Sequence, residues 1–307
     1  MLKSLSSIKR PFSCFSRQAS QSAFNEAAKL ASEVSTVDCK DSIEFLLNGK
    51  KVVLKQGEFN PTQPLVEWLR SDKINLKGTK LSCGEGGCGS CTVLLTQYDI
   101  SKNKYVHRPI NSCLMPLGMA HGQSITTIEH LGSVEKGLHP IQKAFIKHHA
   151  VQCGYCTPGF VLNAYSMTLD NPSPTIQDIQ NRFDGNICRC TGYRAIHDAL
   201  KEFTKDGKLN EGAKEISDDS QCKTYICPDP EHFPRNVELK PAKIEYKGTT
   251  FYVPTDLSQL LFLKKKHPNG VLVAGSTELG IDIKVKNQLA PVYISLHKVQ
   301  EFYFSIH

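Results

Sequence analysis

Residues 83–91 are CGEGGCGSC, and this stretch decides how the first half of the chain folds. Its three cysteines have the spacing C-x4-C-x2-C, and a fourth, Cys113, follows 22 residues later. Plant-type 2Fe–2S sites use this spacing. The interleaved glycines agree, because a loop that wraps closely around a cluster needs the positive φ angles that glycine adopts freely. A zinc site is the alternative, but zinc knuckles usually pair two C-x2-C units or add histidine, and the glycines would then be unexplained. We predict that one 2Fe–2S cluster is bound by Cys83, Cys88, Cys91 and Cys113.

A second group of cysteines consists of Cys153 and Cys156 at C-x2-C spacing, and Cys188 and Cys190 at C-x-C spacing. Taken alone, this pattern fits either zinc or a second iron–sulfur cluster. We expect Cys156 and Cys190 each to lie just before a helix, where the N-terminal end of the helix dipole stabilises an anionic cluster. A second cluster would also give the first one an electron partner.

The composition bounds the class of protein. The chain has 307 residues, enough for two or three domains, with 40% hydrophobic and 22% charged residues. No run of eighteen apolar residues occurs, so we predict no transmembrane helix. The net charge of +7 falls to about +3 once two clusters of charge about −2 are counted. No basic stripe with interleaved aromatic residues is present, so we predict no nucleic-acid partner.

The cysteine usage indicates a reducing compartment. Twelve cysteines would suggest disulfides in a secreted protein, but no secretory apolar segment precedes them, and Cys188 and Cys190 are too close to bridge each other well. We therefore expect a cytoplasmic protein. Residues 1–25 are basic and serine-rich, which makes a mitochondrial transit peptide the alternative. Four cysteines without a predicted role are expected to be free thiols: Cys14, Cys39, Cys222 and Cys227.

The first domain is expected at 42–130, after an N-terminal extension at 1–41. Alternation over 42–55 around Asn48-Gly49 predicts a hairpin with a type I′ turn. A short helix at 64–70 and strands at 91–97 and 125–128 complete a small α+β domain.

A helical unit is expected at 138–204, with the second cysteine group in its loops. Its four predicted helices are 139–148, 158–170, 175–183 and 193–204. Thr157 is the predicted N-cap of the second, with Pro158 at its first position, and Thr175 with Asp178 should cap the third. A linker at 205–242 follows. The last region, 243–307, should contain a strand at 244–253, a helix at 256–266 and a strand at 271–274.

These motifs resemble a known family. KLSCGEGGCGSCTV at 80–93, QCGYCTPG at 152–159 and GNICRCTGYR at 185–194 are similar to the iron–sulfur domains of xanthine dehydrogenases and aldehyde oxidases. The resemblance covers about 42–204 and resumes at 243. It implies an α+β chain with a β-grasp ferredoxin-like domain, a four-helix 2Fe–2S domain and an incomplete FAD-binding domain of PCMH type. It also implies that the second cysteine group holds a second 2Fe–2S cluster and that Gln152 lies near a molybdenum cofactor.

VLVAGSTELG at 271–280 resembles the first FAD pyrophosphate loop of the same family. The physical fit is good, because Gly275 permits close approach of the backbone and the following amides can bind phosphate. The resemblance implies a partial FAD site at Leu272, Val273, Ala274, Gly275, Ser276, Thr277, Glu278 and Leu279.

The family resemblance implies a direction of electron flow. Electrons pass from a molybdenum–pterin centre to the Cys153 cluster, then to the Cys83 cluster and on to FAD. The chain stops at His307, early in the flavin domain and without the molybdenum domain. We therefore expect a fragment or truncated gene product with no catalytic residue of its own, whose partners are a molybdenum-cofactor domain and the rest of the flavin domain. A homodimer is a further expectation. The alternatives are a stand-alone 2Fe–2S carrier, a small component of aldehyde-oxidase type and a non-enzymatic zinc scaffold.

Overall fold

The computed structural model describes residues 29, 32, 34–99, 104–135, 137–206 and 239–303. Three expectations fall outside these residues: the basic serine-rich segment, most of the linker, and the thiols of Cys14, Cys222 and Cys227. Within the described ranges, no helix is both long and apolar enough to span a membrane.

The first region is a five-stranded sheet of order β2-β1-β5-β3-β4. Its strands are β1 (Ser42–Leu47), β2 (Lys50–Lys55), β3 (Thr92–Asp99), β4 (Lys104–Asn111) and β5 (Ser124–Thr126). The predicted hairpin is confirmed: β1 pairs with β2 in antiparallel register, and Asn48 and Gly49 have φ of 51° and 76°, as a type I′ turn requires. The predicted helix is confirmed as α2 (Leu65–Arg70). The 3-10 helix η1 (Leu117–Ala120) packs beside β1.

Two predictions for this region were wrong or incomplete. The strand expected at 125–128 ends at Thr126, and Ile128 begins the short helix α3 (Ile128–Leu131). Strand β4 was not predicted. It contains Pro109, and β4 tolerates this residue because it lies at the edge of the sheet.

The helical unit consists of α4 (Pro140–Lys147), α5 (Thr157–Asp170), α6 (Ile176–Arg182) and α7 (Arg194–Lys201). All four predicted helices are present; α4, α6 and α7 are shorter than predicted, and α5 begins one residue earlier. The predicted cap of α6 is confirmed, because the Thr175 side chain accepts the Asp178 N–H and Asp178 accepts the Thr175 N–H. The cap predicted for α5 was wrong by one residue: Cys156 is the N-cap, and Thr157 is the first helical residue.

The last region is a second sheet of order β6-β7-β9-β8. Its strands are β6 (Ala242–Tyr246), β7 (Thr249–Val253), β8 (Val271–Val273) and β9 (Val292–Ser295). The single strand expected at 244–253 is a hairpin instead, because Lys247 and Gly248 take positive φ angles. Helix α10 (Leu257–Lys266) is capped by Asp256, whose side chain accepts the Gln259 N–H. Helix α11 (Leu279–Lys284) and the 3-10 helix η2 (Gln300–Tyr303) complete the region.

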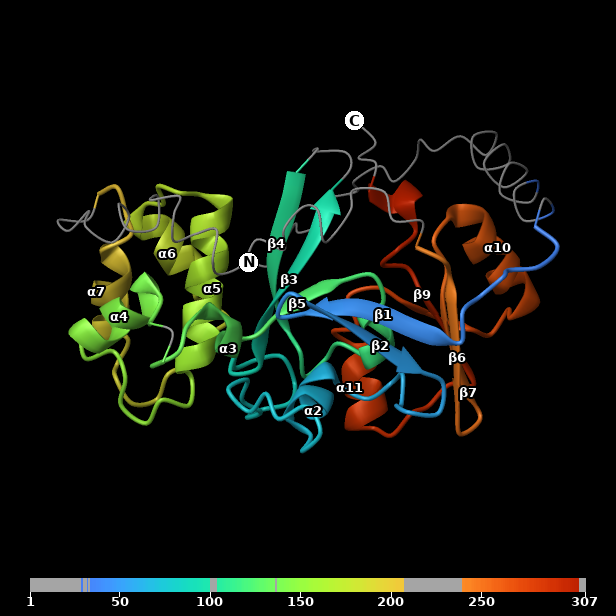
Figure 1. Cartoon of the computed structure of the whole chain (residues 1–307), viewed down its shortest axis with the longest axis horizontal. Coiled ribbons are helices and arrows are strands. Elements are labelled where there is room, and N and C mark those ends of the chain that lie inside the picture. The colour runs from blue at the N-terminus through green and yellow to red at the C-terminus, as the bar shows by residue number, and fades with distance from the viewer. Residues whose placement is uncertain are drawn as a thin grey trace, which may run out of the picture.

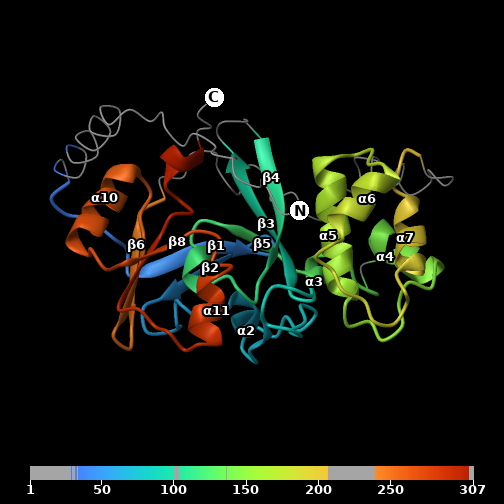
Figure 2. The ribbon, with the colours of Figure 1, turned by 180° about the vertical axis from the view of Figure 1, so that it is seen from behind.

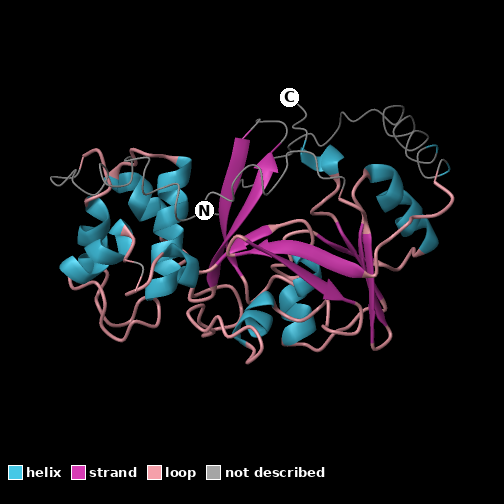
Figure 3. Cartoon of the chain, in the orientation of Figure 1, coloured by secondary structure: helices cyan, strands magenta, loops and turns pink. Residues whose placement is uncertain are grey.

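The three regions lie in a row, with the β1–β5 sheet between the helical unit and the β6–β9 region (Figures 1 and 3). The view from behind shows the same order (Figure 2). The two sheets share one hydrophobic core, in which Phe45 and Leu117 lie in the same cluster as Phe251 and Tyr293. The helical unit has a core of its own, to which Leu94 of β3 contributes. Each cysteine group therefore lies in a differently built part of the chain.

Candidate iron–sulfur and flavin sites

The first four predicted ligands, which we call the first quartet, lie around the start of β3. Cys83 and Cys88 are in the loop that follows α2, Cys91 directly precedes β3, and Cys113 follows β4. The thiols meet in two pairs: the Cys83 thiol donates to Cys88, and the Cys91 thiol donates to Cys113. Cys91 and Cys113 are buried, whereas Cys83 is exposed. A 2Fe–2S cluster needs two thiolates on each iron, so this pairing fits it.

The loop at 83–91 wraps around the thiols through glycines with positive φ, namely Gly84 at 72°, Gly86 at 78° and Gly89 at 69°. A Cβ atom on Gly86 would lie 2.5 Å from Leu114, and one on Gly89 would lie 2.5 Å from the Gly185 carbonyl oxygen. The Glu85 N–H points at the Cys83 sulfur at 3.4 Å. The glycines thus have the close-approach task predicted for them.

Hydrogen bonds prepare one thiol of each pair for deprotonation. Burial opposes ionisation of Cys88, but bonds from Cys83 and Ser90 outweigh it and lower its pKa to about 7. The bond from the Cys91 thiol likewise lowers the pKa of Cys113 to about 7, against the effect of burial, while donating that bond raises the pKa of Cys91. Thiolates are the metal-binding form of cysteine, so these pairs are set up to exchange protons for metal.

The other four predicted ligands, the second quartet, also meet in pairs. The Cys190 thiol donates to Cys153 across 3.5 Å, and the Cys156 thiol donates to Cys188. Burial and that bond raise the pKa of Cys156 to about 12. Burial also opposes ionisation of Cys188. Hydrogen bonds from Thr191 outweigh this effect, so the pKa of Cys188 is lowered. No three His, Cys, Asp or Glu side chains of the described ranges converge on a single-ion position. Cys188 is buried, whereas Cys153 and Cys190 are exposed.

One part of the dipole argument was wrong. Cys156 does lie at the N-terminal end of α5, but α7 begins only at Arg194, four residues after Cys190. Gly192 and Tyr193 take φ of 62° and 69° and turn the chain before the helix starts. The Tyr193 hydroxyl instead accepts the Cys188 N–H at 3.0 Å, and so holds the loop in place.

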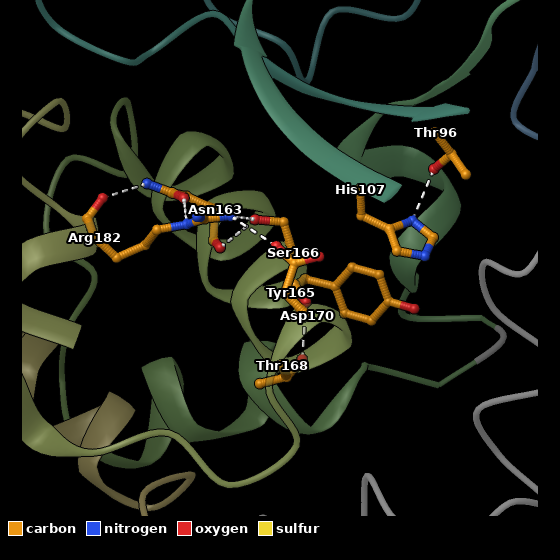
Figure 4. A network of polar contacts seen from close by, with 8 residues as sticks. All are labelled: Thr96, His107, Asn163, Tyr165, Ser166, Thr168, Asp170 and Arg182. Atoms are coloured by element: carbon orange, nitrogen blue, oxygen red, sulfur yellow. Dashed lines mark hydrogen bonds and ion pairs between the residues drawn. The ribbon is translucent and has the colours of Figure 1, made fainter. Parts of the chain in front are cut away.

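A buried amide network, which the sequence reasoning missed, joins the loops that carry the two quartets. Figure 4 shows the part of it around Asn163 and Arg182. The Asn163 side chain on α5 donates to the side-chain oxygen Oδ1 of Asn186 at 2.7 Å and accepts from the Arg182 side chain at 3.1 Å. Asn186 in turn donates to the Gly89 carbonyl oxygen at 3.4 Å. The signal that could have found it is a lone asparagine within the apolar run 160–165 of a helix, since a buried amide must find partners.

The main chain also connects the quartets directly. The Ile187 N–H donates to the Cys88 carbonyl oxygen at 2.9 Å, and Ile187 directly precedes Cys188. The Tyr155 hydroxyl donates to the Leu81 carbonyl oxygen at 2.5 Å. The loops that carry the two cysteine groups are therefore in contact.

The predicted flavin residues form the turn between β8 and α11. Val273 is buried at the end of β8, and Leu279 opens α11. The space above Gly275 is open, since a Cβ atom there would meet nothing within 4 Å. Ser276 has φ of 58°, and its buried hydroxyl has no hydrogen-bond partner among the described residues. An orphaned hydroxyl beside an open glycine turn fits a phosphate-bearing cofactor.

Gln152, which the family resemblance places near a molybdenum cofactor, is exposed next to Cys153.

Domain models match all three regions. A 2Fe-2S iron-sulfur cluster binding domain matches residues 54–117, a [2Fe-2S] binding domain matches 127–201, and a FAD binding domain in molybdopterin dehydrogenase matches 244–303.

Whole-chain comparisons find relatives with the same names as the predicted family. Xanthine dehydrogenase/oxidase of Rattus norvegicus is 38% identical over 292 residues, covering 87% of this chain and 22% of the relative. Aldehyde oxidase 4 of Mus musculus is 35% identical over 290 residues, covering 85% and 21%. The chain thus spans about a fifth of the length of these relatives. Among solved structures, quinoline 2-oxidoreductase from Pseudomonas putida 86 is 35% identical, covers 57% of this chain and 94% of its own, and has a TM-score of 0.47. The chain therefore has two 2Fe–2S domains and part of a FAD-binding domain, and over this length it is similar to xanthine dehydrogenase/oxidase and to aldehyde oxidase.

Proposed function

We propose that this chain is the electron-transfer portion of a molybdenum hydroxylase, and that it passes electrons from a molybdenum centre through two clusters to FAD. In this proposal the first quartet holds one 2Fe–2S cluster and the second quartet holds the other. The ferredoxin-like region at 42–130 has a β-grasp arrangement, and the helical unit at 138–204 is a four-helix domain. The partial FAD domain spans 243–307. Bound clusters supply one-electron redox chemistry, so the chain needs no acid, base or nucleophile of its own.

The hydrogen bond from the Ile187 N–H to the Cys88 carbonyl oxygen is the observation that carries this proposal. This bond links a ligand of one proposed cluster, Cys88, to a ligand of the other, Cys188. The path between them consists of a few main-chain bonds and one hydrogen bond of 2.9 Å. Asn186 and Gly89 add a second contact beside it. Two metal sites that only stabilised the fold would not require this direct connection.

The residues around the quartets control the charge and the solvent. Amide N–H groups such as that of Glu85 point at sulfur and stabilise the more negative, reduced form. Burial of Cys91 and Cys113 keeps water from one side of the first quartet. Cys153 and Cys190 are exposed, and the surface around them, which includes the exposed Gln152, is the proposed docking face for the molybdenum-containing domain.

Other parts of the proposal rest on the flavin turn and on the cysteine chemistry. Ser276 and the turn at 272–279 would hold the FAD pyrophosphate. The remainder of the flavin domain is the second proposed partner, and a homodimer stays a prediction. The cytoplasm, which keeps thiols reduced, is the proposed location.

Cys88→Ser tests the assignment of the quartets. We expect about four irons and four labile sulfides in the wild-type chain, and loss of one of two cluster signals in electron paramagnetic resonance after the substitution. The matched control is Cys39→Ser, because Cys39 belongs to neither quartet and should leave both signals intact. Loss of both signals, or of neither, would contradict two separate sites. Flavin released on denaturation separates this proposal from a carrier without flavin.

A further inference from the structure

Helix α11, which follows the flavin turn, lies directly against the first quartet. Figures 1 and 2 both show α11 beside α2. A Cβ atom on Gly280 would lie 2.8 Å from the carbonyl oxygen of Leu114, the residue after Cys113. Ile281 packs on the small core that contains Cys91 and Cys113. The region that would bind flavin therefore covers the buried pair of the first quartet.

Lys284 extends from the end of α11 over the loop that holds Cys83. Its ammonium nitrogen lies 2.7 Å from the place where a Cβ atom of Gly84 would be. Its charged counterpart is Glu67 on α2, at 4.0 Å, a distance at which the carboxylate only partly offsets the ammonium charge. The Lys284 side chain is only 24% exposed, so water screens its charge less than that of a surface lysine. Two observations explain why residue 84 is glycine: its φ is 72°, and a Cβ atom there would clash with Lys284.

The charge of Lys284 reaches the thiols. The ammonium group lies over Gly84, the residue directly after Cys83, and α11 packs on Leu114, the residue directly after Cys113. A cation that stabilises a thiolate also stabilises the whole anionic cluster. An oxidised 2Fe–2S cluster with four thiolates carries about −2 and gains one more negative charge on reduction, so the reduced form gains more.

We propose that Lys284 raises the reduction potential of the cluster in the first quartet, and that the flavin-binding region thereby makes this cluster a better electron acceptor. The inference rests on the proposed function, because it needs clusters in both quartets. It assigns to a residue outside both iron–sulfur domains a role in setting the direction of electron flow. Glu67 should have the opposite effect, because its negative carboxylate near Lys284 should lower the reduction potential of the same cluster.

The test is a potentiometric titration of the full chain with both clusters, followed by electron paramagnetic resonance so that each cluster is measured separately. Lys284→Met keeps the length of the stem and removes the charge. We expect the reduction equilibrium of the first cluster to become up to about tenfold less favourable, which is up to about 59 mV for one electron. The second cluster should not shift. Lys284→Arg should restore the wild-type value, which a purely structural role of the lysine stem would not require.

Two further variants make the test decisive. Lys286→Met is the matched control, because Lys286 lies on the same segment but pairs with Asp282 at 2.7 Å, and neither cluster should respond. Glu67→Gln should shift the first cluster in the opposite direction, and it stays informative if Lys284→Met fails to bind clusters. Unchanged potentials in Lys284→Met or Glu67→Gln, or equal shifts of both clusters, would overturn the inference. A wild-type chain without two cluster signals would instead overturn the proposed function.

Discussion

The two quartets differ in how their surroundings enclose them. The first is covered by parts of two regions, with Cys91 and Cys113 buried against α2, Leu114 and α11. The second draws all four cysteines from the helical unit; its loops contact the first region, but Cys153 and Cys190 are exposed. Tyr155 and Ile187 beside them are each 43% exposed. Large apolar side chains that remain exposed around a functional group are typical of a surface that a partner covers.

This difference indicates a division of tasks. On the proposed assignment, the cluster of the first quartet would be partly enclosed by two regions of its own chain, and nearby charges such as Lys284 would act on its potential. The cluster of the second quartet, with two exposed ligands, would be the one placed to receive electrons from outside the chain. The comparison also predicts that the two units respond separately to damage. Trp68 is the only tryptophan and lies in α2, so its fluorescence reports on the first unit, while the paramagnetic signal of the second cluster reports on the helical unit.

Phe160→Ala should have the largest effect, and on the helical unit alone. Phe160 is 1% exposed and stacks on Phe183 with ring centroids 5.5 Å apart. Removing a buried aromatic ring costs about 3–5 kcal/mol. We expect the second cluster to be lost at lower urea concentration, with the Trp68 transition nearly unchanged. Val134→Ala, at a residue 92% exposed, is the control. A parallel shift of both probes would show that the units unfold as one.

Asn163→Ala should have an intermediate effect, at the contact between the units. The substitution leaves Asn186 and Arg182 without their shared amide partner in a buried place. Unsatisfied groups of this kind cost about 1–3 kcal/mol. Urea unfolding followed by both probes measures the loss, which should appear in the helical unit first. Gln177→Ala on α6 removes only an exposed bond to Asn181 and should change nothing measurable. Identical behaviour of the two variants would contradict a structural role for the network.

Glu44→Gln should have the smallest effect, confined to the first unit and to a defined pH range. Bonds from Lys40 and Lys51 lower the pKa of Glu44 to about 2 from 4.5. A lowered carboxyl pKa stabilises the native state above pH 4.5, and this contribution is lost as the pH falls from 4.5 towards 2. We expect a loss of less than about 1 kcal/mol at pH 7, because solvent screens the pair. The difference between variant and wild type in the Trp68 transition should shrink below pH 4.5. A difference that grows in acid would reverse the assigned sign.

Much of the fold followed from local sequence. The hairpin turn, the four helices of the helical unit and α10 each depend on caps, turns or periodicity within a few residues, and the structure has all of them. The missed elements are those whose sequence hides their environment. Pro109 and several polar residues mask β4, which is a strand because its neighbour β3 offers a full ladder of partners.

The spacing of the first quartet was informative because it is also local: the nine-residue loop 83–91 carries three of its four cysteines. The contacts around the sites were not predictable in this way. Gly84 and Lys284 are 200 residues apart, and only the packing of α11 on the first quartet brings them together. The network of Asn163, Arg182 and Asn186 likewise depends on how α5 and α6 cross, which no local pattern specifies.

The link between Ile187 and Cys88 has a consequence for mutational tolerance. Both of its atoms belong to the main chain, so a change of either side chain leaves the hydrogen bond in place. Only proline at 187 would remove the donor. The contact between the two cysteine loops therefore depends less on side-chain identity at these two positions than a side-chain hydrogen bond would.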